Sequence, residues 1–224
     1  MNFELSEEQK MIQQNVERFV QDNYDLPKRV ELSSQDPGYS KDYWNSMAEL
    51  GWLGLPFNEE DGGFGGNQID TLVIMEQFGK GLVLEPFLAN VVLGGGAIQI
   101  GGSEELKNEM LSSLIEGSKQ LTLAYAEQQS RFDLEDVATS ARQEGDKYII
   151  NGQKSMVLNA ESSDHIVVVT RTNGGQVDEE GITLFLVDSD SKGLERNNFP
   201  TVDGLRASEI TFDNVEVSSE RMLG

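Results

Sequence analysis

The stretch Leu121–Asn159, LTLAYAEQQSRFDLEDVATSARQEGDKYIINGQKSMVLN, decides the fold of the second half of the chain. Its apolar residues recur at every second position, which is the spacing of a strand with one buried face. Leu121, Leu123 and Tyr125 form the first alternating run, and residues 137–141 form the next. The stretch therefore predicts a sheet built from short strands.

A hairpin turn is predicted at Asn151-Gly152, because this dipeptide accepts the positive backbone angles of a two-residue turn. Further strands are predicted at residues 166–170, 182–187, 209–212 and 215–217. Strands that follow one another this closely favour antiparallel pairing. We therefore expect an antiparallel β domain of barrel or sandwich type over residues 119–224.

The first half of the chain has a helical period instead. Ser6 and Gln9 have capping-box spacing and predict the start of a helix, which Ile12, Val16 and Val20 continue on one face. Four more helices are predicted: residues 40–50, a helix carrying Leu72–Phe78, one starting near Glu85-Pro86, and residues 103–117. Gly94-Gly95-Gly96 must weaken, break or closely pack the fourth of these five helices. The chain is thus predicted to be α+β, with an all-helical domain at residues 1–118.

Composition excludes several classes of function. The net charge of −22 and the pI near 4.2 argue against binding to nucleic acid or to anionic membranes, because both need a basic surface. The absence of cysteine excludes disulfides and thiolate zinc sites, and a single histidine excludes multi-histidine metal sites. No segment has the length and apolarity of a signal peptide or a membrane span. We expect a cytoplasmic protein with no membrane insertion and no metal.

The order of motifs in Leu121–Asn159 resembles that of acyl-CoA dehydrogenases. The family pattern is Thr-Glu-Pro-x-Ala-Gly-Ser-Asp, then Thr-x-Ala, Gly-Asp, Asn-Gly and Lys-x-Trp-x-Thr-Asn. The same frame, without insertion or deletion, is present here as residues 126–133, 139–141, 145–146, 151–152 and 154–159. Residues 50–56, 59–66 and 211–217 also look like family segments, and residues 83–86 with 203–207 resemble the branch that includes the pimeloyl-CoA dehydrogenase small subunit.

The resemblance covers two of the three domains of that family and lacks its C-terminal four-helix domain. It implies a flavoprotein oxidoreductase of fatty acid metabolism that uses FAD for α,β-dehydrogenation of an acyl-CoA thioester. It also implies an electron-transferring flavoprotein as partner and a homo- or hetero-oligomer. The family's carboxylate base lies in the absent domain, so no catalytic residue is expected in this chain. The chain is interpreted as a fragment, an engineered piece or part of a split gene, inactive alone and weak or lacking in FAD binding.

The resemblance also implies the positions of the site residues. Cofactor-binding positions are Tyr125, Ala126, Ser130, Met156, Val157 and Leu158, and substrate positions are Arg131 and Phe132. Four family side chains are replaced: threonine by Ala126, serine by Phe132, tryptophan by Met156 and threonine by Leu158. Main-chain groups of Ala126 and Leu158 are still expected to form a ledge for the flavin ring. Ser130 and Arg131 are expected to meet pyrophosphate or CoA phosphates.

Several alternatives remain open at this level. For Arg131, an ion pair with Asp133, Glu135 or Asp136 is as well supported by the sequence as binding to phosphate. The four replacements motivate a second hypothesis, a non-catalytic scaffold subunit of a hetero-oligomeric dehydrogenase, and a flavin oxidase or monooxygenase is a third. His165, Glu127 and the glycine-rich loop at residues 62–66 are interpreted as structural.

Overall fold

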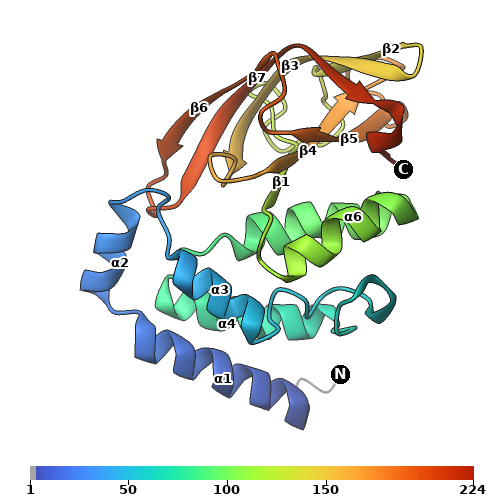
Figure 1. Ribbon diagram of the computed structural model, residues 1–224. Coiled ribbons are helices and arrows are strands. Elements are labelled where there is room, and N and C mark those ends of the chain that lie inside the picture. Colours follow the sequence, from blue (N-terminus) through green and yellow to red (C-terminus); the bar gives the residue numbers. More distant parts are fainter. Residues whose placement is uncertain (1–3) are drawn as a thin grey trace. The chain divides into compact units, whose positions relative to one another are not determined.

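Residues 4–224 are described by a computed structural model in which helices precede strands (Figure 1). The helices are α1 (Glu7–Asn23), α2 (Leu26–Ser33), α3 (Lys41–Glu49), α4 (Gln68–Gly81), the π-helix η2 (Leu88–Gly95), α5 (Gly96–Gly101) and α6 (Glu104–Ile115), with short 3-10 turns η1 (Glu59–Asp61) and η3 (Ser219–Arg221). The strands are β1 (Leu121–Ala124), β2 (Ser140–Glu144), β3 (Lys147–Leu158), β4 (His165–Arg171), β5 (Ile182–Asp188), β6 (Leu194–Pro200), β7 (Arg206–Ser218) and β8 (Met222–Leu223). The predicted α+β class is confirmed.

Side-chain caps start the N-terminal helices as the sequence predicts. The Ser6 hydroxyl accepts from the Gln9 amide at 3.1 Å, and the Gln9 side chain accepts from the Ser6 amide at 3.0 Å. At α3 the Ser40 hydroxyl accepts from the Tyr43 amide at 3.3 Å, without a return bond. Helix α2 was not predicted, although Asp25 is its cap and Pro27 lies in its first turn, where proline is tolerated.

The predicted helix at Glu85-Pro86 takes an unexpected form. It begins at Leu88 and is wound as the wider π-helix η2 before α5 continues it. At Gly94, η2 lies against β1 so closely that an added Cβ would be 2.7 Å from the Leu121 Cβ. The Asn90 side chain accepts from the Leu121 amide at 2.8 Å. The glycine run therefore permits close packing, one of the outcomes that the sequence left open.

The chain divides into two compact units. The first comprises residues up to Glu85 together with Ile115–Gly117, and the second comprises Pro86–Leu114 and Ser118–Gly224. The core of the first unit contains Trp44 and Met47, and the Trp44 indole donates to the Gly117 carbonyl at 3.1 Å. The second unit holds the whole sheet together with η2, α5 and α6.

A buried carboxylate links three segments of the first unit. Glu85 accepts hydrogen bonds from the Tyr24 hydroxyl and, at 3.1 Å, from the Ser40 amide. Burial raises the pKa of the Glu85 carboxyl, and burial together with the Glu85 charge raises the pKa of Tyr24. The carboxylate is therefore held in the folded protein at an electrostatic cost, which its two donors offset.

This arrangement gives a pH-dependent prediction for Glu85→Gln. Because the folded pKa of Glu85 lies above the ordinary value of 4.5, its contribution to stability is complete below that pH and is lost as the pH rises toward the folded pKa. The variant removes this titration, so its unfolding free energy relative to wild type should rise with pH above 4.5. Urea unfolding from pH 4 to pH 8 measures this, with exposed Glu8→Gln as the control. Parallel curves for Glu85→Gln and wild type would contradict it.

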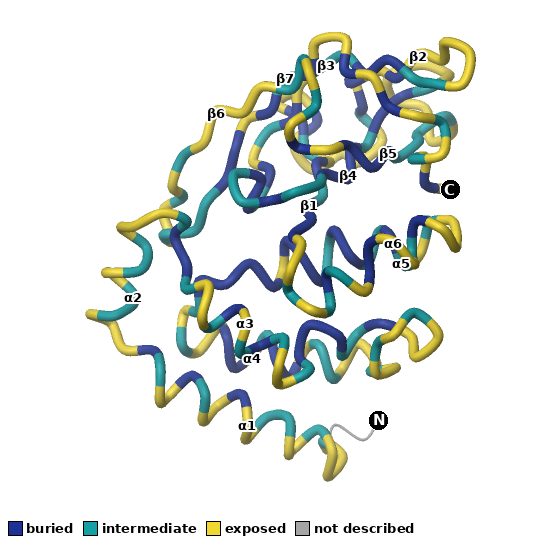
Figure 2. The backbone as a smooth tube through the Cα atoms, viewed as in Figure 1, coloured by how far each residue is buried: buried dark blue, intermediate teal, exposed yellow. Residues whose placement is uncertain are grey.

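The sheet has the strand order β6-β7-β3-β2-β4-β5-β8, and β1 pairs with β4 off this path. The pairs are antiparallel except β1 with β4 and a single bridge between β2 and β4, which are parallel. The antiparallel prediction therefore holds for most of the sheet but not for β1. Strand β6 forms an edge that is exposed along most of its length (Figure 2).

The predicted hairpin at Asn151-Gly152 is wrong. The β2–β3 turn is Gly145-Asp146, and β3 runs without a break through Asn151 and Gly152. Gly152 adopts φ +147°, and a Cβ there would lie 2.6 Å from the Thr139 Cα. The glycine is therefore needed for a close approach of two backbone segments within the sheet.

Strands β3 and β7 contain two opposed bulges. Between Ile150/Val215 and Gly152/Phe212 the extra residue is on β7, where Asn214 has φ +53°. Between the pairs Lys154/Ile210 and Val157/Ser208 the extra residue is on β3. The two offsets cancel, so the pairing beyond them returns to the register it had before them.

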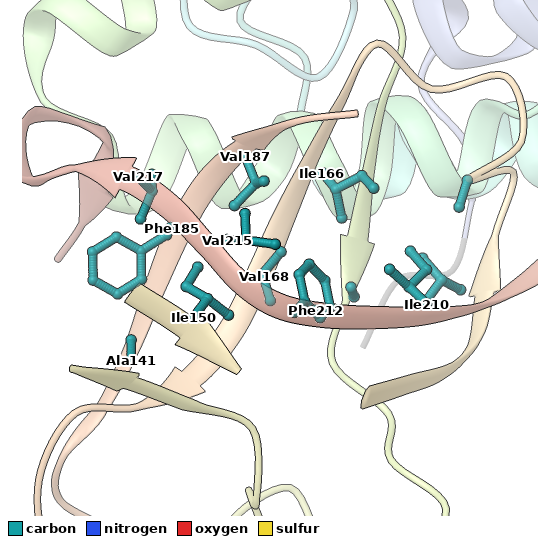
Figure 3. Close-up of a cluster of buried hydrophobic side chains, with 13 residues drawn as sticks. Ala141, Ile150, Ile166, Val168, Phe185, Val187, Ile210, Phe212, Val215 and Val217 are labelled. Atoms are coloured by element: carbon teal, nitrogen blue, oxygen red, sulfur yellow. The ribbon is translucent and has the colours of Figure 1, made fainter. Parts of the chain in front are cut away.

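One face of the curved sheet encloses the core of the second unit (Figure 3). The buried side chains of this core are Ala124, Ala141, Ile150, Val157, Ala160, Ile166, Val168, Phe185, Val187, Ile210, Phe212, Val215 and Val217. They come from β1, β2, β3, β4, β5 and β7 and from the turn after β3, so the sheet curls over one interior as a barrel-like domain does.

Candidate functional site

The end of β1 and the end of β3 together form a strand edge that we call the ledge, defined by Ala126, Met156 and Leu158. The Ser155 amide donates to the Ala126 carbonyl at 2.8 Å, which joins the two segments. The Ala126 amide has no acceptor among residues 4–224, and Ala126 is partly exposed. The ledge thus offers an open main-chain donor.

The amide and carbonyl of Leu158 point away from β7, toward the side on which Ala126 lies. The Asn159 amide donates to the Arg206 carbonyl of β7 at 2.8 Å. Since successive residues of an antiparallel strand point their peptide groups to opposite sides, the Leu158 amide points away from β7. The Leu158 carbonyl on that side accepts from the Thr122 hydroxyl at 2.6 Å.

The β3 bulge determines which side chains reach the ledge. Ser155 and Met156 together face the single residue Glu209, and Met156 has φ +51°. The Met156 side chain is 50% exposed, whereas Lys154 and Val157 on either side of the bulge are buried. Bulges redirect side chains in this way near functional sites.

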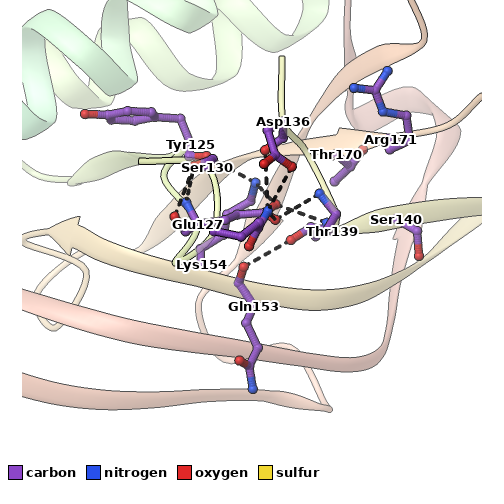
Figure 4. A network of polar contacts seen from close by, with 12 residues as sticks. Tyr125, Glu127, Ser130, Asp136, Thr139, Ser140, Gln153, Lys154, Thr170 and Arg171 are labelled. Carbon is purple, nitrogen blue, oxygen red and sulfur yellow. Dashed lines mark hydrogen bonds and ion pairs between the residues drawn. The ribbon is translucent and has the colours of Figure 1, made fainter. Parts of the chain in front are cut away.

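An ion pair is buried behind the ledge (Figure 4). Lys154 is 0% exposed, and its Nζ lies 2.6 Å from Oε1 of Glu127. Burial alone would raise the pKa of Glu127, but the hydrogen bonds donated by Lys154 and Gln129 outweigh it and bring the pKa down to about 2. Glu127 is therefore a charged structural carboxylate and is not poised as a base.

Lys154 lies in one of the motifs that resemble the family, but the resemblance implies no role for it. A signal was present, since Lys154 is four residues from the buried Ile150 and shares its strand face. A lysine on a buried face needs a counter-charge. Its partner Glu127 lies in a separate loop, so strand periodicity alone does not identify it.

The segment between Glu127 and Thr139 carries the predicted substrate positions. Arg131 has φ +51°, is exposed and makes no ion pair among residues 4–224, so the alternative pairings with neighbouring acids do not form. Phe132 is 99% exposed. Ser130 is buried, and its hydroxyl donates to the Glu127 carbonyl at 3.0 Å and accepts from the Glu127 amide at 3.1 Å. Ser130 therefore closes the loop on itself and directs no donor outward.

The remaining predicted cofactor positions divide into two groups. Tyr125 is 45% exposed beside Ala126. The Val157 side chain packs in the core and therefore does not reach the surface, and its backbone pairs with Ser208 of β7. The structure thus brings Tyr125, Ala126, Met156 and Leu158 to the ledge and turns Ser130 and Val157 inward.

Arg171 anchors the other end of the same segment. Its guanidinium donates to the Glu135 and Gln176 carbonyls from Nη2, at 2.7 and 2.8 Å. Nη1 donates to the Asp178 and Glu180 carbonyls, both at 2.8 Å. A buried cation with four carbonyl acceptors ties the segment to the acidic loop after β4.

Other candidates behave as structural groups. The His165 ring contacts Asp188 at 2.8 Å in the β4–β5 pair. Within residues 4–224, histidine and acidic side chains form no cluster of three that could hold a metal ion. None of the helices in that range is both long and apolar enough for a membrane crossing.

Comparison with known proteins identifies the family. Residues 6–118 match the model of the acyl-CoA dehydrogenase N-terminal domain, and residues 122–215 match the model of its middle domain. The chain is 31% identical, over its whole length, to the probable acyl-CoA dehydrogenase YngJ of Bacillus subtilis, and covers 60% of that protein. It is 28% identical over 98% of its length to the caffeyl-CoA reductase-Etf complex subunit CarC of Acetobacterium woodii, of which it covers 59%.

A solved structure shows the same fold. The acyl-CoA dehydrogenase of Geobacillus kaustophilus matches the whole chain with a TM-score of 0.87 at 26% identity, and 60% of that protein is covered. The chain therefore spans about three-fifths of the length of each relative. Because two family models account for both halves of the sequence, the chain belongs to the acyl-CoA dehydrogenase family, as the motifs of the Leu121–Asn159 stretch indicated.

Proposed function

We propose that the second unit carries the flavin-facing surface of an FAD-dependent acyl-CoA dehydrogenase. The observation that carries the proposal is the amide of the half-exposed Ala126, a main-chain donor without an acceptor among residues 4–224. A backbone N–H at the surface that has no intramolecular acceptor is free to donate to water or to a ligand. A carbonyl of the isoalloxazine ring is an acceptor of the required kind.

The residues fit FAD through the main chain more than through side chains. Ala126 and Leu158 offer amides, and the half-exposed Met156 offers an apolar surface on which a flat ring can lie. The chemistry that bound FAD would supply is hydride acceptance from the β-carbon of the acyl group. The residues of this chain bind and orient the ring, and the resemblance places the carboxylate base in a further helical domain. The proposal therefore assigns no catalytic residue here and expects no turnover from this chain alone.

Substrate and partners follow as parts of the same proposal. Arg131, exposed and without an ion pair among the described residues, is a suitable cation for a CoA phosphate, and Phe132 offers an apolar contact beside it. The CarC relative is named as a subunit of a reductase-Etf complex. This name supports an electron-transferring flavoprotein as the electron acceptor of the present protein, and it supports an oligomeric assembly.

Restoring the missing hydroxyls tests the proposal. Ala126→Thr and Leu158→Thr should each tighten FAD binding about twofold to twelvefold, since one net hydrogen bond contributes about 0.5–1.5 kcal/mol. Fluorescence quenching of FAD titrated with the full chain measures the affinity. Ala138→Thr is the matched control, because it adds the same hydroxyl to an exposed position of the same segment, away from the ledge.

The outcomes separate the two candidate functions. Tighter binding by the ledge variants alone supports the flavin surface. Ledge variants that bind FAD no more tightly than Ala138→Thr contradict it and favour the scaffold subunit, for which the inward Ser130 hydroxyl is the supporting observation.

A further inference from the structure

Four hydrogen-bond donors converge on the Glu127 carboxylate. They are Lys154 Nζ at 2.6 Å, the Gln129 side chain at 2.7 Å, and the Ala138 and Thr139 amides at 2.9 and 3.0 Å. The carboxylate therefore joins both ends of the segment 127–139 to β3. A neutral amide side chain has one acceptor oxygen in place of two and cannot accept all four bonds in the same way.

The same ammonium also contacts the main chain just before Ala126. Lys154 Nζ donates to the Tyr125 carbonyl at 3.3 Å. This carbonyl and the unpaired Ala126 amide belong to one peptide group. Because a trans peptide is planar and its C=O and N–H point in opposite directions, a carbonyl held by the buried ammonium turns the Ala126 N–H outward. The Ser155 amide fixes the next peptide by donating to the Ala126 carbonyl at 2.8 Å.

We propose that Lys154 is a positioning residue for the cofactor, which orients the Tyr125–Ala126 peptide and makes its N–H a stronger donor. A cation on the carbonyl side of a peptide polarises the whole group, so the N–H on the other side donates more strongly. Glu127 holds the ammonium in place and keeps the buried charge balanced. The inference rests on the proposed function and names a residue behind the ledge that controls it without touching the ligand.

A comparison of three variants distinguishes positioning from general stability. Lys154→Met removes the ammonium but keeps most of the apolar stem. Lys154→Met with Glu127→Gln removes both charges, so no unpaired charge remains buried. Arg171→Met is the matched control, because it removes another buried cation that holds the far end of the same segment by main-chain carbonyls.

The expected pattern is specific. Lys154→Met should weaken FAD binding about tenfold, the loss expected for one hydrogen bond of about 1.4 kcal/mol. The double variant should recover much of the thermal stability but remain weak in FAD binding, whereas Arg171→Met should lose stability and keep its FAD affinity. If FAD affinity follows melting temperature across all three variants, Lys154 has only a structural role and the proposal is wrong.

A measurement without FAD keeps this inference separate from the proposed function. In the full chain free of cofactor, the amide proton resonance of Ala126 should shift upfield in Lys154→Met and in the double variant, and stay in place in Arg171→Met. An unchanged Ala126 resonance in Lys154→Met overturns the positioning role even if FAD binds. If the resonance shifts as expected but neither Ala126→Thr nor Leu158→Thr binds FAD more tightly than Ala138→Thr, the proposed function alone is refuted.

Discussion

Lys154→Met is expected to lower the free energy of unfolding of the second unit by about 3–5 kcal/mol, the cost of breaking a buried ion pair. The variant leaves Glu127 buried without an ion-pair partner among residues 4–224, and its carboxylate then depends on neutral donors alone. Urea unfolding at pH 7 measures the loss. Lys147→Met is the matched control on the same strand, because its pair with Glu216 at 2.7 Å is exposed and should contribute little to stability.

The pH dependence of this loss has a defined direction. The folded pKa of Glu127, about 2, lies below the ordinary value of 4.5. Its stabilising contribution is therefore complete above pH 4.5 and is lost as the pH falls toward 2. Wild type should lose this contribution over that range while Lys154→Met does not, so the two stabilities converge in acid. Equal losses for Lys154→Met and Lys147→Met at pH 7 would show that the pair is not a buried one in solution.

Gly94→Ala is expected to destabilise the second unit by about 1–3 kcal/mol, because the new methyl group has no room against β1. A Cβ there would be 2.7 Å from the Leu121 Cβ and 3.0 Å from the Leu121 carbonyl carbon, and backbone cannot move aside as a flexible side chain does. The Asn90 bond to the Leu121 amide would be strained at the same time. Thermal and urea unfolding measure the change.

Gly96→Ala provides the control two residues away. A Cβ at Gly96 meets no atom within 4 Å, and its φ of −59° suits any helical residue. This substitution should stabilise the protein by about 0.4–1 kcal/mol, since alanine loses less backbone freedom on folding than glycine. If both variants change stability in the same direction, the close packing of η2 on β1 is not what limits position 94.

Local signals predicted the elements, and contacts distant in sequence decided the exceptions. The Ser6 and Gln9 cap and the alternation after Leu121 were sufficient to place α1 and β1, because both depend on neighbouring residues. The hairpin turn predicted at Asn151-Gly152 was wrong because this dipeptide suits both a turn and a bulged strand. The close approach of Thr139 and the pairing with β7 select the bulged strand. The parallel pairing of β1 with β4 is likewise set by segments more than 40 residues apart.

The candidate site shows the same division. Motif spacing located Ala126, Met156 and Leu158, and the structure brings them to one strand edge. The inward turn of Ser130 could not be predicted, because a serine in a polar loop has many possible partners, including its own backbone. The burial of Val157 followed from a bulge, which shifts the alternation by one residue and leaves no clear mark in the sequence.

The two opposed bulges in β3 and β7 each add one residue that has no partner of its own. Deleting Met156 would leave Ser155 alone opposite Glu209, while Val157 and Leu158 would keep Ser208 and Ala207 as partners. Deleting Asn214 would remove the second bulge in the same way. Each strand can therefore lose its extra residue without a change of pairing elsewhere, and what the sheet would lose at Met156 is the exposed side chain beside Leu158.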